Sequence, residues 1–338
     1  MPIHDVGYRA WVGTRMPRIH AFLVMVLSGI MITRRSAWIR RMLAASWLPV
    51  VYIGAGFYFI EQTLQTADPS ARRMFVDLFG RFFSVPNTDA LQQGLMSAEL
   101  DRHRIWAGLI AIFLSYPQSV ASLVLTGLIA PPLISRDLRT RAYLIYFSKP
   151  IGKWDYIGGK LATIGAFLAF ITLLPALSLY LCGVGLSPDL SVIYSTWDLP
   201  FRIVVASLVF ILPTSAIALM FSSLTHESRY ASLAWFTFWI LGYSGWSVIR
   251  AALVSAEIQM ASAGAQPGGS GMRWEEVFAK VNQSNWSLLS LYDSMTRIQA
   301  WVLGVTPTVP TAQLVLIIGL TVFSLMVLSR RVTAPIRI

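Results

Sequence analysis

Charged side chains are scarce in this chain, and its longest apolar runs contain none. The 338 residues are 55% hydrophobic and only 13% charged, and the mean hydropathy is +0.61. A soluble globular domain usually has about 25% charged residues. Several uncharged runs reach the roughly 20 residues that a helix needs to cross the hydrocarbon core of a bilayer. The composition therefore argues against an ordinary soluble domain and predicts a membrane protein.

The groups that intramembrane catalysis and metal binding need are also few. Cys182 is the one cysteine, which excludes an internal disulfide and a cysteine-rich metal site. His4, His20, His103 and His226 lie in separate segments, without the spacing of paired metal ligands. No carboxylate lies inside an apolar run, where a proton-coupled transporter would usually keep one. The sequence therefore predicts no metal or catalytic site, and a membrane enzyme is the weakest of its functional hypotheses.

The chain also lacks a recognisable ATP-binding motif. A P-loop needs a glycine, four further residues, and then Gly-Lys followed by Ser or Thr. The nearest candidate, Gly158–Lys160, lacks the first glycine and is followed by Leu161. We therefore expect no cofactor in this chain. If the protein does uphill work, ATP and Mg²⁺ must be bound by another polypeptide.

Six apolar runs predict six transmembrane helices in one membrane domain, residues 42–330, followed by a tail, residues 331–338. The predicted fold class is an all-α membrane protein with an N-terminal interfacial helix and amphipathic extracytoplasmic helices. The predicted spans, with approximate ends, are residues 42–60, 105–134, 161–183, 203–224, 231–249 and 310–329.

The N-terminal segment, residues 1–41, contains a shorter apolar run over residues 21–33. A helix of that length reaches only about 20 Å, which is too short to span a bilayer. We interpret it as a helix in the cytoplasmic interface, because Arg34, Arg35 and nearby arginines suit the anionic headgroups of membrane lipids. A helix packed against the bundle is the alternative.

Basic residues are distributed unequally between the two sides of the predicted bundle. One side receives the N-terminal segment, residues 135–160, the turn 225–229 and the tail from Arg330, with 17 basic and 4 acidic residues. The other side has 10 basic and 12 acidic residues. Because basic loops stay in the cytoplasm, we expect a multi-pass protein of the inner (cytoplasmic) membrane with both termini cytoplasmic. Topology thus explains the net charge of +11, and no nucleic-acid partner is expected.

Two long segments, residues 61–104 and 250–304, are predicted on the outer side. The first ends in a helical pattern after Thr88. In the second, apolar residues with the spacing of one helix face follow Trp274, and residues 286–304 predict another interfacial helix. These segments could act as lids or bind an extracytoplasmic partner.

The segment between the second and third predicted spans, residues 135–160, has more regular features than a basic loop needs. Ser135 is expected to cap a helix, and Asp137 to pair with Arg141 one turn later. The helix would extend over residues 135–147, about 18 Å along the cytoplasmic face, and would end at the proline that follows. A plain interfacial loop is the alternative, but a capped, aromatic-rich helix favours docking to a cytoplasmic partner.

The same segment contains a longer pattern: Ser-x-Asp, then Ser-Lys-Pro, then a tyrosine and Gly-Lys. The residues that form it are Ser135, Asp137, Ser148, Lys149, Pro150, Tyr156, Gly159 and Lys160. The pattern resembles the first cytoplasmic loop of the permeases of ABC-2 type ABC transporters. The six-span layout and the N-terminal interfacial helix are also similar to that family, and residues 221–233 resemble its second cytoplasmic turn.

The resemblance implies a permease subunit that pairs with a second copy or a paralogue and docks ABC-type ATP-binding subunits, which hold ATP and Mg²⁺. It implies ATP-driven transport, usually export, with the helix after residue 135 as the coupling helix. A non-transporting membrane anchor or assembly protein that recruits a cytoplasmic ATPase is the alternative. The candidate docking residues are Ser135, Arg136, Asp137, Arg139, Arg141, Tyr143, Phe147, Lys149 and Pro150 in the coupling helix, and Thr225, Glu227 and Arg229 in the second turn.

Overall fold

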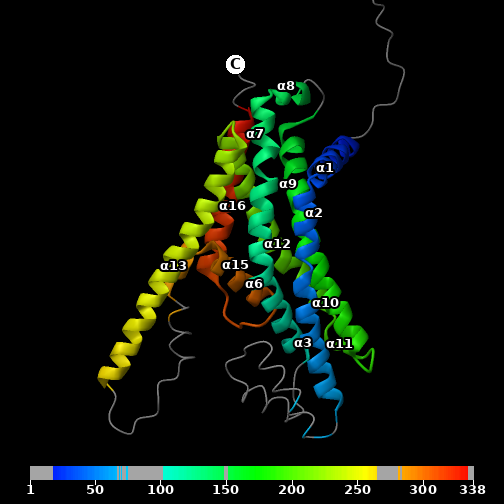
Figure 1. The fold of residues 1–338 in the computed structure, drawn as a ribbon, viewed down its shortest axis with the longest axis vertical. Helices are drawn as coiled ribbons and strands as arrows, with labels where there is room; N and C mark the ends of the chain where they lie inside the picture. The colour runs from blue at the N-terminus through cyan, green and yellow to red at the C-terminus, as the bar shows by residue number, and fades with distance from the viewer. Residues whose placement is uncertain are drawn as a thin grey trace, which may run out of the picture.

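The structure is a computed structural model that describes residues 18–66, 102–147, 151–264 and 284–333, and in addition Asp68, Ser70, Met74 and Val281. Every regular element in these ranges is a helix (Figure 1). The predicted all-α membrane class is therefore confirmed. By length and composition, five helical stretches in these ranges could cross a membrane: Ala37–Thr63, Val120–Arg139, Lys153–Leu186, Leu199–Leu224 and Thr311–Val332.

The predicted fifth span, residues 231–249, lies inside α13 (Ser228–Gly264), a helix of 37 residues. α13 is long enough to cross a bilayer, but its tryptophan, tyrosine, serine and glycine residues make it less apolar than the five stretches. The count of six spans therefore stays a prediction. Toward its C-terminal end α13 diverges from the other helices (Figure 1), and side chains such as Val248 are exposed there.

Three helices form the first part of the bundle: α1 (Arg18–Arg34), α2 (Ala37–Ala45) and α3 (Leu48–Gln65). α1 contains the short apolar run and packs closely on α9 (Lys153–Ile171), where a Cβ added at Gly29 would lie 2.7 Å from the hydroxyl of Thr163. Its other side exposes large apolar side chains such as Leu27 and Met31. α1 thus has a packed face and an exposed apolar face, and its interfacial position stays a prediction.

α12 (Leu199–Leu224) is the central helix of the bundle. Its one charged residue is Arg202, so the rest of the helix can be buried without removing an ion from water. Buried side chains form one cluster around Ile217 and Trp235 and a second around Phe57 and Trp106. The helices that contact α12 include α6 (Arg102–Ile129), α7 (Pro131–Arg139), α9, α10 (Leu173–Leu186), α13, α15 (Leu291–Val302) and α16 (Thr311–Thr333).

The third apolar stretch begins eight residues before the predicted position of 161, at the start of α9. The side chain of Asp155 accepts a hydrogen bond of 2.9 Å from the backbone N–H of Gly152, which closes the first turn there. The stretch is interrupted at Thr172, between α9 and α10. Pro175 has no N–H for the carbonyl of Ile171, so the regular bonding pattern stops at this point.

The segment after α6 forms two short helices, α7 and α8 (Ala142–Phe147), and not the single predicted helix over residues 135–147. α7 already begins at Pro131, because a proline at the first helical position has the required φ and needs no N–H partner. The helices are separated at Thr140 and Arg141, where Arg141 has a left-handed φ of 54°. This residue turns the chain, so α8 does not continue the axis of α7.

Two further short helices are α11 (Val192–Ser195) and the 3-10 helix η1 (Asn285–Leu289). η1 packs against α13, where a Cβ added at Gly242 would lie 2.9 Å from the carbonyl of Leu289. The helix predicted over residues 286–304 is present as η1 and α15. α15 is held on α12 by the side chain of Gln299, which donates a 3.1 Å hydrogen bond to the carbonyl of Ala206. The helix predicted after Thr88 lies outside the described residues. Of the helical pattern that begins at Trp274, only Val281 is described, and it is helical and buried.

Candidate functional site

One end of the bundle gathers α7, α8, the start of α9, the turn between α12 and α13, and the end of α16 (Figure 1). We call this the α7–α8 end. It contains the candidate docking residues of both polar segments. Of these, Lys149 and Pro150 lie outside the described residues, and Tyr143 and Phe147 are described only as parts of the α8 backbone.

A buried group of hydroxyls joins α7 to α12 and α13. In α7 the N–H groups of Ile134 and Ser135, the fourth and fifth residues of the helix, both donate to the hydroxyl of Ser222 on α12, at 3.2 and 3.1 Å. The Ser222 hydroxyl in turn donates to the carbonyl of Pro131 at 2.6 Å. The Ser135 hydroxyl lies 2.9 Å from that of Ser228 on α13. α7 is therefore capped by a residue of another helix.

The predicted role of Ser135 as an N-cap is wrong. Ser135 lies within α7, four residues after Pro131, and its hydroxyl donates to the carbonyl of that proline at 2.5 Å. Its exposed fraction is 0%. A side chain in this position contributes to the packing of α7 against α12 and α13 and has no surface for a docked partner.

Asp137 faces α9, and its predicted pair with Arg141 is also wrong. One carboxylate oxygen of Asp137, Oδ2, lies 2.8 Å from Nζ of Lys160 and accepts a 2.8 Å hydrogen bond from the hydroxyl of Tyr156. The side chains of Asp137 and Lys160 are 14% and 13% exposed. The turn at Arg141 takes that residue out of the regular helix, so the one-turn spacing no longer places its side chain beside Asp137.

Tyr146 brings α8 into the same cluster. Its ring lies 5.7 Å from that of Tyr156, and Nζ of Lys160 lies 5.9 Å from its centre. Burial raises the pKa of Tyr146, and the nearby negative charge of Asp137 raises it further. Three residues of the resemblance pattern, Asp137, Tyr156 and Lys160, thus meet in a largely buried clamp that holds α7, α8 and α9 together.

The exposed side of the α7–α8 end is basic. Arg136, Arg139 and Arg141 are exposed. Nη1 of Arg139 lies 3.5 Å from the carboxylate of Glu227, and the two side chains are 55% and 42% exposed. This contact brings the two predicted docking segments to one surface, although an ion pair this exposed contributes little stability.

The second turn is ordered by its own contacts. The hydroxyl of Thr225 donates a 3.0 Å hydrogen bond to the carbonyl of Glu227. The guanidinium of Arg229 lies 5.0 Å from the ring centre of Tyr230. Thr225 therefore shapes the turn, Glu227 reaches Arg139, and Arg229 remains exposed beside them.

Sequence reasoning missed Ser222 and Ser228 as members of this site. Serines in apolar helices usually bond the backbone of their own turn, so neither residue stands out in the sequence. Two consecutive prolines, Pro131 and Pro132, are the signal that could have found them. They begin a helix whose next N–H groups are buried, and such groups require acceptors from elsewhere.

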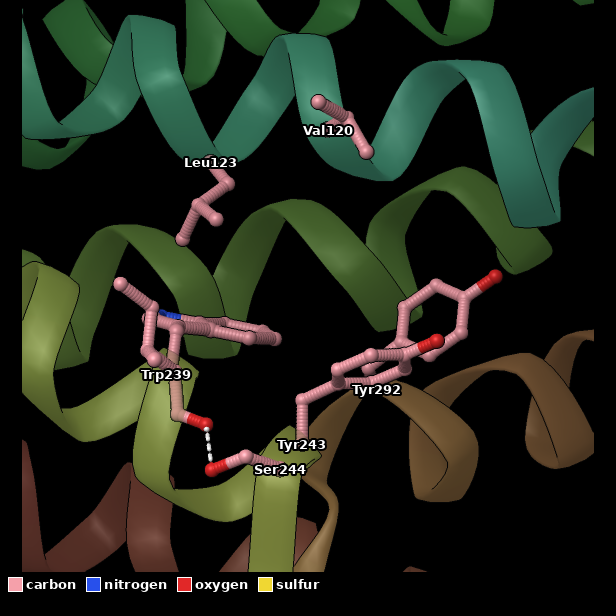
Figure 2. Close-up of a pocket in the computed structure, with 7 residues that line it drawn as sticks. Val120, Leu123, Trp239, Tyr243, Ser244 and Tyr292 are labelled. Atoms are coloured by element: carbon pink, nitrogen blue, oxygen red, sulfur yellow. Dashed lines mark hydrogen bonds between the residues drawn. The ribbon is translucent and has the colours of Figure 1, made fainter. Parts of the chain in front are cut away.

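An apolar cavity of about 300 Å³ lies between α6, α13 and α15. Figure 2 shows Val120 and Leu123 on one side and the rings of Trp239, Tyr243 and Tyr292 on the other. The two tyrosine rings meet edge to face, with centres 6.1 Å apart. The cavity has the chemistry of a site for an apolar group and offers few polar contacts.

The opposite end contains a network of hydrogen-bonded polar side chains around Asp198. His103 of α6 lies 2.9 Å from one oxygen of Asp198, and Nε of Arg202 donates to the other at 2.6 Å. Arg202 also donates to the carbonyl of Val302, 3.1 Å away. Burial alone would raise the pKa of Asp198, but these two partners hold it below its ordinary value. The network ties the start of α6 and α12 to the end of α15.

A second acidic residue at that end is buried. Glu61 of α3 is 1% exposed, and it lies 3.5 Å from the guanidinium of Arg102 while it accepts a 3.2 Å hydrogen bond from the indole of Trp106. Among the residues that the structure describes, no group of three or more His, Cys, Asp and Glu side chains could hold a metal ion. Glu61 therefore connects α3 to α6 and contributes to the packing of the bundle.

The comparisons with known proteins agree with the helical membrane architecture. No individually curated protein matches the chain. The family described as "ABC-2 family transporter protein" matches residues 20–332, which is nearly the whole length. The match includes every described helix from α2 to α15, and all but the ends of α1 and α16. The chain therefore belongs to the ABC-2 family of transporter proteins.

Proposed function

We propose that the chain is the permease subunit of an ABC transporter and that a separate ATP-binding subunit docks on its α7–α8 end. Membership of the ABC-2 family supports the permease role. One observation of the structure carries the docking proposal. α7 is tied by buried hydrogen bonds to α9, α12 and α13, while its basic edge is exposed. A helix that is bonded to neighbouring helices on one side and exposed on the other can transmit the motion of a docked subunit to those helices.

The path of that force follows from the buried contacts. A displacement of α7 would pull α12 through Ser222 and α13 through Ser228, because both hydroxyls bond within α7. It would pull α9 through Lys160 and Tyr156, which hold Asp137. These contacts are short and buried, so they resist stretching more than exposed ion pairs do. The docked subunit would thus move three apolar helices together.

The orientation and the energy source belong to the same proposal. We assign the α7–α8 end to the cytoplasm of the inner membrane. Arg330 and Arg331 end α16 there, and basic residues favour the cytoplasmic side. ATP and Mg²⁺ are then bound by the docked subunit, the direction is export, and a second permease copy or a paralogue completes the pathway.

The test uses two exposed arginines for which the structure shows no side-chain partner among the described residues. We expect the double substitution Arg136→Glu and Arg141→Glu to reduce the amount of ATP-binding subunit that co-purifies from the native cell by about tenfold, because two attractive charges become repulsive. Native mass spectrometry of the complex in mild detergent measures the ratio of subunits.

Arg104→Glu is the matched control, because it reverses an exposed arginine at the opposite end. It should leave the ratio of subunits unchanged. An unchanged ratio in the double variant, with a folded permease, contradicts docking on this face.

A further inference from the structure

A second and larger cavity, of about 740 Å³, lies between α6, α15 and the start of α16. Gly108, Ala111 and Ile112 of α6 supply an apolar wall. Hydroxyls and amides line the other side, together with one charged residue, Arg297 of α15. We call it the Arg297 cavity. Its size is that of a site for a small organic molecule, and its lining combines apolar side chains with hydroxyls, one amide and one cation.

Arg297 is a half-buried cation without a direct partner. Its guanidinium makes no hydrogen bond and no ion pair with any residue that the structure describes. Burial lowers the pKa of Arg297, the negative charge of Asp293 raises it, and Arg250 of α13 adds a second positive charge nearby. Arginine stays protonated at neutral pH even so. A guanidinium has five N–H donors, and because Arg297 lines the cavity these donors are available to a ligand there.

Asp293 lies one turn before Arg297 on α15, but it is not a direct partner of the Arg297 guanidinium. Its carboxylate does not line the cavity, and its Oδ2 atom is buried without a hydrogen-bond partner among the described residues. The distance between Asp293 and Arg297 exceeds that of an ion pair, since none forms. Among the described residues that line the cavity, Arg297 therefore carries the only charge.

Gln313 is a second polar residue in the lining. It lies in the first turn of α16, lines the cavity and is 8% exposed as a whole residue. Its side-chain amide has no hydrogen-bond partner among the described residues. An amide can donate to an oxyanion, as a guanidinium can. Because Gln313 and Arg297 line the same cavity, one acidic group could bind both side chains.

We propose that the Arg297 cavity binds an amphipathic acid, with its oxyanion on Arg297 and Gln313 and its apolar chain against the wall of α6. A carboxylate or a phosphate ester fits the guanidinium, which pairs with such groups through two parallel hydrogen bonds. The apolar cavity of Figure 2 lies further along α6, at Val120 and Leu123, and is bordered by the same α15. The inference does not rest on docking of an ATP-binding subunit, because the purified chain alone tests it.

The probe is radiolabelled dodecanoate, added to the full-length protein in dodecyl maltoside. The uncharged detergent supplies a competing dodecyl chain in excess, so the measured preference reports the acid group. Specific binding is the part that excess unlabelled dodecanoate displaces. We expect Arg297→Gln to weaken specific binding by about tenfold or more, because a charge-assisted pair is lost. Arg297→Lys keeps the charge and should retain binding to within about threefold.

A second variant fills part of the Arg297 cavity without altering its charge. A Cβ added at Gly108 meets no atom within 4 Å, so Gly108→Leu can be accommodated and should fill the apolar part of the cavity. We expect it to weaken dodecanoate binding about tenfold while the thermal unfolding midpoint is kept. Arg104→Gln, which removes an exposed arginine at the same end, should change nothing.

The outcomes separate clearly. Loss of binding in Arg297→Gln and Gly108→Leu, with no displacement by dodecanol, supports the site. Equal binding by the wild type and Arg297→Gln overturns it, and so does displacement by dodecanol as efficient as that by dodecanoate. Displacement by inorganic phosphate at similar concentrations overturns the apolar part of the proposal and assigns the cavity to a free anion.

Discussion

At the residue scale, the hydroxyl of Ser222 makes three hydrogen bonds to the backbone of α7. Ser222 accepts from two backbone N–H groups and donates to a carbonyl, all within 3.2 Å. It is 0% exposed, so water cannot replace it. Both prolines at the start of α7 lack N–H groups, so the bonds of Ser222 to Ile134, Ser135 and Pro131 hold this part of the helix on α12.

Ser222→Ala should lower the free energy of unfolding by about 1–3 kcal/mol, because the buried N–H groups of Ile134 and Ser135 lose the hydroxyl to which both donate. Ser255→Ala is the control, since that exposed hydroxyl bonds only the carbonyl of Ala252 in its own helix. It should change stability by less than about 0.5 kcal/mol. Unfolding of the purified proteins in mixed micelles measures both variants. Equal effects of the two substitutions would contradict the role of Ser222.

At the element scale, the α7–α8 corner determines which side chains face outward. The left-handed conformation of Arg141 ends α7 and redirects the chain into α8. Asp137 and Tyr146 then turn toward Lys160, whereas Arg136 and Arg139 remain exposed. A continuous helix would carry Tyr146 away from α9, so the corner and the clamp depend on each other.

Arg141→Gly should stabilise the protein by about 0.5–1 kcal/mol, because glycine adopts a positive φ without a steric penalty. Arg136→Gly should destabilise it by about 1 kcal/mol, since position 136 lies inside the regular part of α7. Both substitutions remove one exposed arginine, so the difference between their effects on the free energy of unfolding reports the backbone conformation at each position. The same micelle unfolding measurement applies, and a destabilised Arg141→Gly would show that residue 141 does not need the left-handed region.

At the scale of the whole molecule, α12 connects two differently built ends. At the α7–α8 end it is held by the neutral hydroxyl of Ser222. At the opposite end the hydrogen-bonded group of His103, Asp198 and Arg202 links its first turn to α6 and α15. The stability of this second end should depend on pH, whereas that of the hydroxyl contacts should not.

The direction in which stability changes with pH follows from the pKa of Asp198, which is lower in the folded protein than its ordinary value of 3.8. Its contribution to stability is therefore complete above that ordinary value and is lost as the pH falls through the folded value. We expect the unfolding midpoint to fall as the pH drops below the ordinary pKa of this carboxylate, and Asp198→Asn to flatten this part of the curve. Asp189→Asn, at an exposed acid of the same end, is the control. An identical pH curve for wild type and Asp198→Asn would refute the assignment.

The sequence alone determined the class of this protein and the position of its charged segments. Transfer of charge into hydrocarbon is so costly that apolar runs and basic loops can be located without knowledge of the fold. It also placed helices at α1 and α15 and identified the segment around residues 135–160 as unusual. These conclusions depend on local composition and spacing, which each segment carries with it.

Only the tertiary structure decided which residues meet. Local rules predicted Ser135 as a cap and Asp137 with Arg141, but packing placed Ser135 against Ser228 and Asp137 against Lys160. In the same way, the unpartnered donors of Arg297 and Gln313 become a site only because α15 and α16 pack beside α6. Buried partners far apart in the chain outweigh neighbours one turn away, because the cost of an unsatisfied polar group in the interior exceeds the gain of a local exposed pair.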